Sequence, residues 1–313
     1  MPVISFNNKQ IQIEAGKNLL DSLTEKGFAI PNGCRSGFCQ SCLMVVNKGN
    51  PCKNSQTGLK DTLKTSGHFL ACQCIPSDDM DISLPEQNEF IHTATVMKNT
   101  RLATNVAGIR LKKVFDFKPG QFITIFRDNT GRSYSIASHP EDDYMELHVK
   151  NYSGGMLSPW LNSLHPGDAI RFSGPSGSCF YIPHDKKILL AGTGTGLAPL
   201  YGILMDALQQ KHPAEIHLVW GGLTPDDLYF HAQLLNLEKN HTGFSYHPCV
   251  ISGAGSDGKI REISVIDLAK DVVSDPQNWI YYFAGPGELV NNLKKKLFLA
   301  GASMQNIYSD PFN

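Results

Sequence analysis

A cysteine-rich stretch near the N-terminus decides how the first part of this chain folds: residues 31–43 read PNGCRSGFCQSCL. Its cysteines, Cys34, Cys39 and Cys42, have the spacing C-x4-C-x2-C, and Cys72 follows thirty residues later. The 313-residue chain has only 8 cysteines, which is too few for a disulfide scaffold, yet six of them lie between positions 34 and 74. Such crowding predicts a metal site.

The spacing of the four cysteines is typical of the thiolate ligands of a [2Fe-2S] cluster. The residues between and beside them are small, so backbone N–H groups can approach the cluster sulfurs and tune their charge. These small neighbours are Gly33, Ser36, Gly37 and Ser41.

A structural zinc site is the alternative interpretation of the same cysteines. Such sites usually pair two short C-x2–4-C knuckles, whereas the second half here would be only Cys72-Gln73-Cys74. The spacing alone leaves the fourth ligand open. The cysteines outside the ligand set are expected to be buried or loop thiols without a role: Cys52, Cys74, Cys179 and Cys249.

The stretch Pro31 to Leu43, together with the segment FLACQ at residues 69–73, resembles the plant-type ferredoxin domain. The resemblance covers residues 1–90 and implies a β-grasp fold. In that family the last cluster ligand is the cysteine after such a Leu-Ala pair. The resemblance therefore implies four metal ligands: Cys34, Cys39, Cys42 and Cys72.

Composition and charge exclude several classes of partner. The chain is 41% hydrophobic and 18% charged, which is globular composition, and its net charge of -1 gives no field that would hold nucleic acid. Residues 188–205 carry no charge, but the glycines at 192–196 and Pro199 would break a membrane-spanning helix at its centre. Residues 1–10 lack the basic start and apolar run of a signal peptide. We expect a cytoplasmic protein with no membrane contact.

Two further patterns follow the cysteine-rich part. Between residues 93 and 183, short apolar strands separated by Pro-Gly and Gly-Asp turns predict an antiparallel barrel or sandwich. After Lys186, apolar strands alternate with helical stretches, which predicts an α/β domain with a parallel sheet. The chain is therefore predicted to be a multi-domain α+β protein with domains at residues 1–90, 91–185 and 186–313.

The tetrapeptide RSYS at residues 132–135 has the side chains that a flavin nucleotide needs. The Arg132 guanidinium can bind a pyrophosphate, the Tyr134 ring can stack on an isoalloxazine, and the Ser135 hydroxyl can reach flavin N5. An isolated match of this kind is more often an exposed arginine beside a half-buried strand tyrosine. Here GGMLS at residues 154–158 follows, where a turn into a helix can offer N–H groups to a second phosphate.

A glycine-rich turn lies between a predicted strand and helix, where residues 192–199 read GTGTGLAP. Pro199 fits the first helical turn, where its missing N–H costs little. The turn does not match the dinucleotide fingerprint G-x-G-x-x-G, because position 197 is a leucine. Glycine content alone is a modest argument for nucleotide binding.

The order of these three motifs resembles the ferredoxin–NADP reductase superfamily, which implies an antiparallel β-barrel FAD domain followed by an α/β nicotinamide-binding domain. The whole chain resembles the three-module reductases of bacterial ring-hydroxylating and monooxygenase systems. The resemblance implies FAD contacts from Arg132, Tyr134, Ser135, Lys150, Gly155, Met156 and Ser158. It implies nicotinamide dinucleotide contacts from Gly194, Thr195, Gly196, Asp226, Ala284 and Gly285.

The chain departs from the family near the end of the last long strand, where Ala284 stands at the position of a common cysteine. Without that thiol against the nicotinamide, the sequence does not establish the rate of hydride transfer, although flavin and nicotinamide binding are still expected. The terminal segment at 307–312 does resemble the family, and Phe312 is expected either to lie near the flavin or to belong to a disordered tail. NADH is favoured over NADPH, because residues 221–227 contain two acids and no cation for a 2′-phosphate.

The predicted function is that of a NADH-dependent iron–sulfur flavoprotein, in which hydride passes to FAD and single electrons pass to the cluster. No side chain is required as a general acid or base. The expected acceptor is a protein, most simply a terminal dioxygenase or monooxygenase, that meets the loop containing Arg35 and Phe38. Similar three-module chains also serve deoxysugar reduction, as in CDP-6-deoxyglucoseen reductase. The missing thiol at position 284 also leaves open a non-catalytic metal-binding interaction module.

Overall fold

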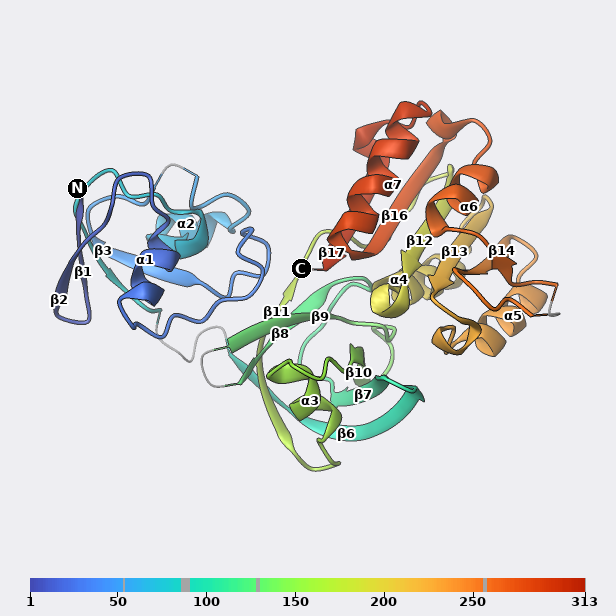
Figure 1. Ribbon diagram of the computed structural model, residues 1–313, viewed down its shortest axis with the longest axis horizontal. Coiled ribbons are helices and arrows are strands. Elements are labelled where there is room, and N and C mark those ends of the chain that lie inside the picture. The colour runs from blue at the N-terminus through green and yellow to red at the C-terminus, as the bar shows by residue number, and fades with distance from the viewer. Residues whose placement is uncertain (53, 86–90, 128–129, 256–257, 313) are drawn as a thin grey trace. The chain divides into compact units, whose positions relative to one another are not determined.

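The computed structural model describes residues 1–52, 54–85, 91–127, 130–255 and 258–312 (Figure 1). Contacts between residues divide the chain into two compact units. The first unit comprises residues 1–93, 123–133 and 170–176, and the second comprises residues 94–122, 134–169 and 177–313.

The N-terminal sheet has five strands in the order β2-β1-β5-β3-β4. β1 and β2 form an antiparallel hairpin whose tip residues Asn7 and Asn8 have positive φ, and β1 pairs with β5 in parallel. A short helix packs its leucines into the core of this sheet, as a β-grasp fold requires. The elements are β1 (Val3–Phe6), β2 (Lys9–Gln12), α1 (Leu19–Glu25), β3 (Leu43–Lys48), α2 (Asp61–Thr65), β4 (His68–Leu70), η1 (Ala71–Gln73) and β5 (Met80–Ser83).

The second sheet has six strands in the order β10-β7-β6-β11-β8-β9, in which β7 pairs antiparallel with both β10 and β6. A bridge between Ile136, just after β9, and Leu147 on β10 brings the two ends of this order together, so the sheet closes into a barrel. The elements are β6 (His92–Ala103), β7 (Val106–Lys112), β8 (Phe122–Arg127), β9 (Thr130–Ser135), β10 (Tyr144–Lys150), α3 (Leu157–Asn162) and β11 (Ala169–Ser176).

The third sheet is parallel, with the order β15-β14-β13-β12-β16-β17. Its central strands are mostly apolar and buried, as expected where helices cover both faces of a sheet, with α4 and α5 on one core and α6 and α7 on the other (Figure 1). The elements are β12 (Lys187–Thr193), η2 (Gly194–Gly196), α4 (Leu197–Gln209), β13 (Ile216–Gly222), η3 (Pro225–Asp227), α5 (His231–Asn240), β14 (Phe244–Val250), β15 (Arg261–Glu262), α6 (Val265–Val272), η4 (Pro276–Asn278), β16 (Trp279–Pro286), α7 (Gly287–Leu299), η5 (Met304–Asn306) and β17 (Ile307–Phe312).

The predicted fold class is confirmed in each of its three parts. The uncharged stretch at residues 188–205 forms β12, the glycine turn and the start of α4. In the described part of the chain, no helix has both the length and the apolar character needed to cross a bilayer. The terminal segment is not a disordered tail up to Phe312, because β17 pairs in parallel with β16.

Candidate functional site

The four predicted cluster ligands come together in the first unit as two pairs of thiols. Cys34 and Cys39 share one hydrogen bond, and Cys42 and Cys72 share another. Among the residues that the structure describes, no three His, Cys, Asp or Glu side chains lie close enough together to bind one metal ion. Two pairs fit a [2Fe-2S] cluster, in which each iron takes two thiolates, better than they fit one tetrahedral zinc ion.

Backbone N–H groups point at the sulfurs of this cysteine loop. The amides of Ser36 and Cys39 donate to Cys34 Sγ at 3.4 and 3.3 Å, and the amide of Cys72 donates to Cys42 Sγ at 3.4 Å. The hydrogen bond from the Cys39 thiol, with these amides, lowers the pKa of Cys34 to about 4. A hydrogen bond from Cys42 lowers the pKa of Cys72 to about 7. The pKa values of their partners Cys39 and Cys42 are raised, by the hydrogen bond to the partner thiol and by burial. In each pair, therefore, one thiol is shifted toward the thiolate, the form that binds iron.

Gly33 leaves the space that this loop needs. A Cβ at Gly33 would lie 3.1 Å from Cys39 Sγ and 3.1 Å from the Gly131 carbonyl oxygen, so a side chain would crowd the ligand sulfur. The Ser41 hydroxyl donates to the same Cys39 sulfur at 3.2 Å. Small residues and N–H donors around the four thiols fit a cluster at this place.

The expectation that Cys52 and Cys74 are free thiols is wrong. The two residues form a disulfide with a Cα–Cα distance of 5.2 Å, within the usual range for such bridges. The two cysteines are 22 positions apart in the sequence. The spacing of cysteines does not show which segments of the chain meet, so the pairing could not be predicted from the sequence. The disulfide leaves Cys72 free for the cluster pair.

Within the first unit, the cysteine loop lies against β8 and the first part of β9, where the RSYS motif begins. The Gly131 amide donates to the Asn32 carbonyl at 3.2 Å, and the Thr124 hydroxyl is 3.4 Å from the Cys39 carbonyl oxygen. Thr124 is also 3.1 Å from the Ser133 hydroxyl. Arg132 follows directly on β9, with an exposed side chain whose Nη1 donates to the Gly131 carbonyl at 2.9 Å. The first residues of the flavin motif and the cluster loop are therefore neighbours.

In the second unit, the Ser135 side chain is turned toward a residue that the sequence analysis missed. Its buried hydroxyl donates to Asp310 Oδ2 at 2.7 Å. Asp310 lies on β17 directly beside Ala284 of β16, and burial raises the pKa of its carboxyl to about 6. The only sequence signal for Asp310 was its place two residues before Phe312. A carboxyl with this pKa, beside Ser135 and Ala284, can hold a proton at slightly acidic pH.

The predicted second phosphate turn is built around Ser158. Its Oγ accepts from the Tyr152 amide at 3.1 Å, and the Gly155 amide donates to the Tyr152 carbonyl at 2.9 Å. Met156 is 66% exposed at the start of α3, and the Lys150 ammonium lies 5.6 Å from the centre of the Tyr152 ring. The structure thus brings Lys150 and the GGMLS turn together around Tyr152.

The glycine turn after β12 makes a close approach that only glycines allow. A Cβ at Gly192 or Gly196 would lie 2.4 Å from the Ala284 carbonyl oxygen. Gly194 has φ +54 and Gly285 has φ +128, values that side chains disfavour. The predicted residues of η2, with Thr195 among them, therefore lie beside Ala284 and Gly285, as one nucleotide site requires.

The acidic segment after β13 contains one structural and one free acid. The Asp227 carboxylate accepts from the amides of Leu223 and Thr224, completing a capping box. Asp226 is exposed at the carboxyl end of its strand. This is the edge of a parallel sheet at which a dinucleotide ribose is usually recognised.

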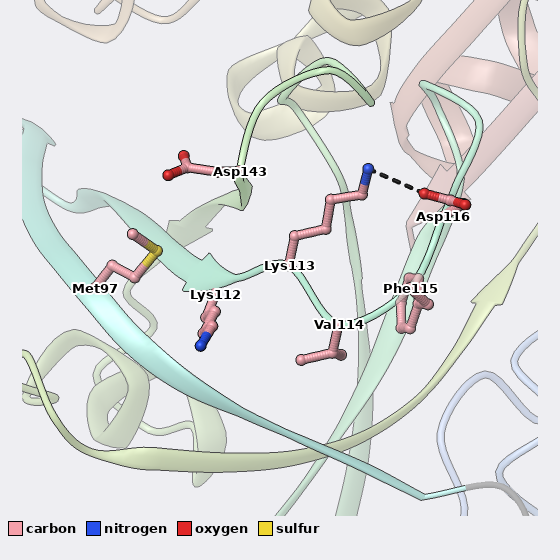
Figure 2. A pocket seen from close by; sticks show the side chains of 7 residues that line it. All are labelled: Met97, Lys112, Lys113, Val114, Phe115, Asp116 and Asp143. Carbon is pink, nitrogen blue, oxygen red and sulfur yellow. Dashed lines mark ion pairs between the residues drawn. The ribbon is translucent and has the colours of Figure 1, made fainter.

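A surface pocket of about 780 Å³ lies elsewhere on the second unit. Figure 2 shows its lining, in which the Lys113 ammonium pairs with Asp116 at 3.1 Å. It is lined by Met97, Lys112, Lys113, Val114, Phe115, Asp116 and Asp143. No predicted flavin, nicotinamide or cluster residue is among them, so this pocket is separate from the site described above.

Comparison with known families divides the chain in the predicted order. Residues 4–77 match the 2Fe-2S iron-sulfur cluster binding domain, residues 91–181 the oxidoreductase FAD-binding domain, and residues 190–295 the oxidoreductase NAD-binding domain.

Similar proteins match along their whole length. The reductase component of the naphthalene 1,2-dioxygenase system of Pseudomonas putida is 31% identical over 99% of this chain and 98% of its own. Reductase component 1 of the terephthalate 1,2-dioxygenase of a Comamonas species is 29% identical over 95% of this chain and 92% of its own. The crystal structure of an Amycolatopsis cytochrome P450 reductase superposes with a TM-score of 0.68 at 27% identity, covering 100% of this chain and 99% of that one. The chain belongs to the family of three-module oxygenase-type reductases, in which a [2Fe-2S] ferredoxin domain precedes a ferredoxin–NADP reductase-like FAD and NAD module.

Proposed function

We propose that this chain takes electrons from NADH and delivers them singly, through FAD and a [2Fe-2S] cluster, to a terminal oxygenase. The observation that carries the proposal is the contact of the cysteine loop with β8 and β9. Asn32 is joined by a hydrogen bond to Gly131 of β9, immediately before the flavin motif begins, and Cys39 is joined to Thr124 of the neighbouring strand β8. Electron transfer between two carriers needs such proximity.

Each cofactor has a set of residues on this chain. We assign the cluster to Cys34, Cys39, Cys42 and Cys72, and FAD to Arg132, Tyr134, Ser135, Lys150, Gly155, Met156 and Ser158. We assign the dinucleotide to Gly194, Thr195, Gly196, Asp226, Ala284 and Gly285. These sets match domain boundaries near residues 90 and 185.

When bound, FAD supplies the conversion of an electron pair into single electrons, because a nicotinamide gives up two electrons together and a [2Fe-2S] cluster accepts one. The residues of the chain bind, orient and shield. The Arg132 guanidinium holds the pyrophosphate, and the close packing of Gly192 and Gly196 on Ala284 fixes the turn that receives the dinucleotide. Asp310 holds Ser135 in place and keeps a proton beside it up to about its pKa of 6.

The segment after β13 favours NADH as the donor. A 2′-phosphate needs a cation, and residues 221–227 contain only the acids Asp226 and Asp227. Asp227 is occupied by its capping bonds, which leaves the exposed Asp226 carboxylate to accept from a ribose hydroxyl. Equal catalytic efficiency with NADPH would contradict this assignment.

The acceptor meets the cysteine loop at Phe38, whose side chain is 69% exposed. Arg35, three residues earlier on the same loop, is half-exposed and paired with Asp21 at 2.9 Å. An exposed aromatic residue with an adjacent cation is suited to a transient protein interface. The related proteins described above serve dioxygenase systems, which favours an oxygenase over an enzyme of deoxysugar reduction as the acceptor.

A visible spectrum before and after anaerobic addition of NADH tests the relay. Flavin and iron–sulfur absorption should both bleach, and the cluster signal should appear in electron paramagnetic resonance. Bleaching of the flavin alone would mean that the cluster is not on the path. A colourless protein that does not oxidise NADH would instead support the non-catalytic binding module.

A further inference from the structure

The carbonyl of Gly194, at the start of the glycine turn, is held by two side chains that the motifs do not include. The Trp220 indole Nε1 donates to it at 3.0 Å, and the Tyr229 hydroxyl lies 3.5 Å from it. Gly194 has φ +54, so its peptide adopts a conformation that the turn alone does not enforce. Fixing this carbonyl fixes the direction of the N–H groups that follow in η2.

Tyr229 is in turn held by a histidine from the barrel strand β10. The Tyr229 oxygen is 3.0 Å from His148 Nδ1, and the two rings meet edge to face at a centroid distance of 5.3 Å. A carbonyl cannot donate, so the hydroxyl gives its proton to Gly194 and accepts one from His148 Nδ1. Burial raises the pKa of Tyr229 well above its ordinary value, which keeps the hydroxyl protonated.

His148 has a fixed position because its side chain is fully buried between charged and aromatic groups. Glu146 Oε1 lies 3.5 Å from its Nε2, and Arg110 Nε binds the other oxygen of Glu146 at 2.7 Å. The Phe230 ring packs edge-on against the imidazole at 5.1 Å. All of these residues belong to the second unit.

We propose that Tyr229 and His148 are positioning residues for the dinucleotide, acting through the Gly194 carbonyl. The proposal rests on the nicotinamide site assigned above and deepens it. The pair holds the glycine turn in its binding conformation. His148 belongs to the barrel strand β10, two residues before Lys150 of the assigned flavin set. Loss of the Tyr229 or the His148 hydrogen bond leaves the Gly194 carbonyl held by Trp220 alone, so the turn is less restrained and dinucleotide affinity falls while FAD stays bound.

The test compares Tyr229→Phe with Tyr281→Phe in the holoprotein. Tyr281 is a matched control, because it is a buried tyrosine of the same domain whose hydroxyl donates to the Pro276 carbonyl at 2.7 Å instead of to the glycine turn. The dissociation constant for NAD⁺ is measured by calorimetry, together with FAD content and the rate of flavin reduction at saturating NADH. We expect Tyr229→Phe to weaken NAD⁺ binding about three- to tenfold, with FAD content unchanged and the saturated rate altered less than about twofold.

His148 supplies the second arm. His148→Leu removes the donor, whereas His148→Asn keeps an N–H near the Nδ1 position, so Asn should retain most of the affinity that Leu loses. Combining His148→Leu with Tyr229→Phe should cost no more than the larger single effect, because both act on one carbonyl. Equal NAD⁺ affinity in Tyr229→Phe and Tyr281→Phe would overturn the proposal, as would equal affinity in the Asn and Leu variants. Failure of the unaltered protein to bind NAD⁺ would instead reject the nicotinamide site itself.

Discussion

Ser135 Oγ donates a 2.7 Å hydrogen bond to Asp310 Oδ2 across 175 positions of sequence. The contact joins the barrel strand that carries the flavin motif to the last strand of the nicotinamide domain. It is partly buried, and Asp310 lies beside Ala284, the position at which the family commonly has a cysteine. Where a thiol is missing, this chain has a carboxyl with a raised pKa at the same end of the sheet.

Asp310→Asn should change how stability depends on pH. The folded pKa of about 6 lies above the ordinary value of 3.8, so the native state holds an extra proton between those values. Asp310 therefore favours folding at low pH, and this contribution is lost as the pH rises through 6. We expect the wild-type melting temperature to fall relative to that of Asp310→Asn between pH 5 and pH 8, by the equivalent of about 1.4 kcal/mol. If the melting temperatures of the two proteins changed equally with pH over this range, the raised pKa of Asp310 would be refuted.

Cys72→Ser should abolish the cluster, and Cys74→Ser should leave it. Cys72 shares a hydrogen bond with Cys42 and accepts no disulfide partner, whereas Cys74 is bonded to Cys52. Iron content and visible absorption of the purified variants decide the question. If the Cys72→Ser variant kept the cluster, the fourth ligand would have to be another residue.

Opening the Cys52–Cys74 disulfide should destabilise the ferredoxin domain. It closes a loop with a sequence separation of 22, for which chain entropy gives a stabilisation of about 3 kcal/mol. The double variant Cys52→Ser/Cys74→Ser should lose its cluster at a lower denaturant concentration than the wild type. A reducing agent should shift the wild type toward the variant and leave the variant unchanged, and the absence of both effects would contradict a stabilising role.

Gly196→Ala should impair the nicotinamide site. The added Cβ would lie 2.4 Å from the Ala284 carbonyl oxygen, a backbone atom that cannot rotate away. We expect at least a tenfold loss of NAD⁺ affinity or of soluble protein. Gly243→Ala is the control, because its nearest neighbour would be 3.9 Å away on an exposed loop. Comparable affinity in both variants would show that the close packing does not shape the site.

The histidine pair on the parallel sheet should make the protein sensitive to acid. His217 Nδ1 and His247 Nε2 are 3.0 Å apart and the rings stack, and burial together with the neighbouring His217 lowers the pKa of His247 to about 4. A folded pKa below the unfolded value of 6.5 means that stability is complete above pH 6.5 and falls as the pH drops toward 4. At pH 5 the loss should be about 2 kcal/mol. Thermal melts of the wild type and His247→Phe check this, since the variant should lack the acid-dependent part of the loss.

Motifs with local causes were predictable from the sequence. The cysteine spacing and the glycine turn at 192–196 depend on neighbouring residues, and each forms as expected. The alternation of strands and helices after Lys186 also predicted a parallel sheet correctly. In each case a repeating or closely spaced pattern carries the information.

Relationships across the fold could not be predicted. Nothing near Asp310 in sequence indicates that it would face Ser135, because that pairing depends on how β17 is added to the edge of the sheet. The Cys52–Cys74 bond and the contact of Tyr229 with His148 are also long-range. A buried polar side chain gains its role from its partner, and a single sequence contains no record of which segments meet.

Two adjacent residues of the cysteine loop have different surroundings: the Cys39 carbonyl is tied to Thr124, and the Phe38 ring is open to solvent. Reduction of the cluster and its oxidation by the acceptor therefore do not need the same surface of the loop. An acceptor protein can bind at Phe38 while Cys39 remains bonded to Thr124 of β8, so turnover does not require the ferredoxin domain to move away and return. A longer connection between the ferredoxin domain and the FAD domain should then leave the rate of electron delivery almost unaltered. In carriers that move on a flexible linker, the same change would alter that rate.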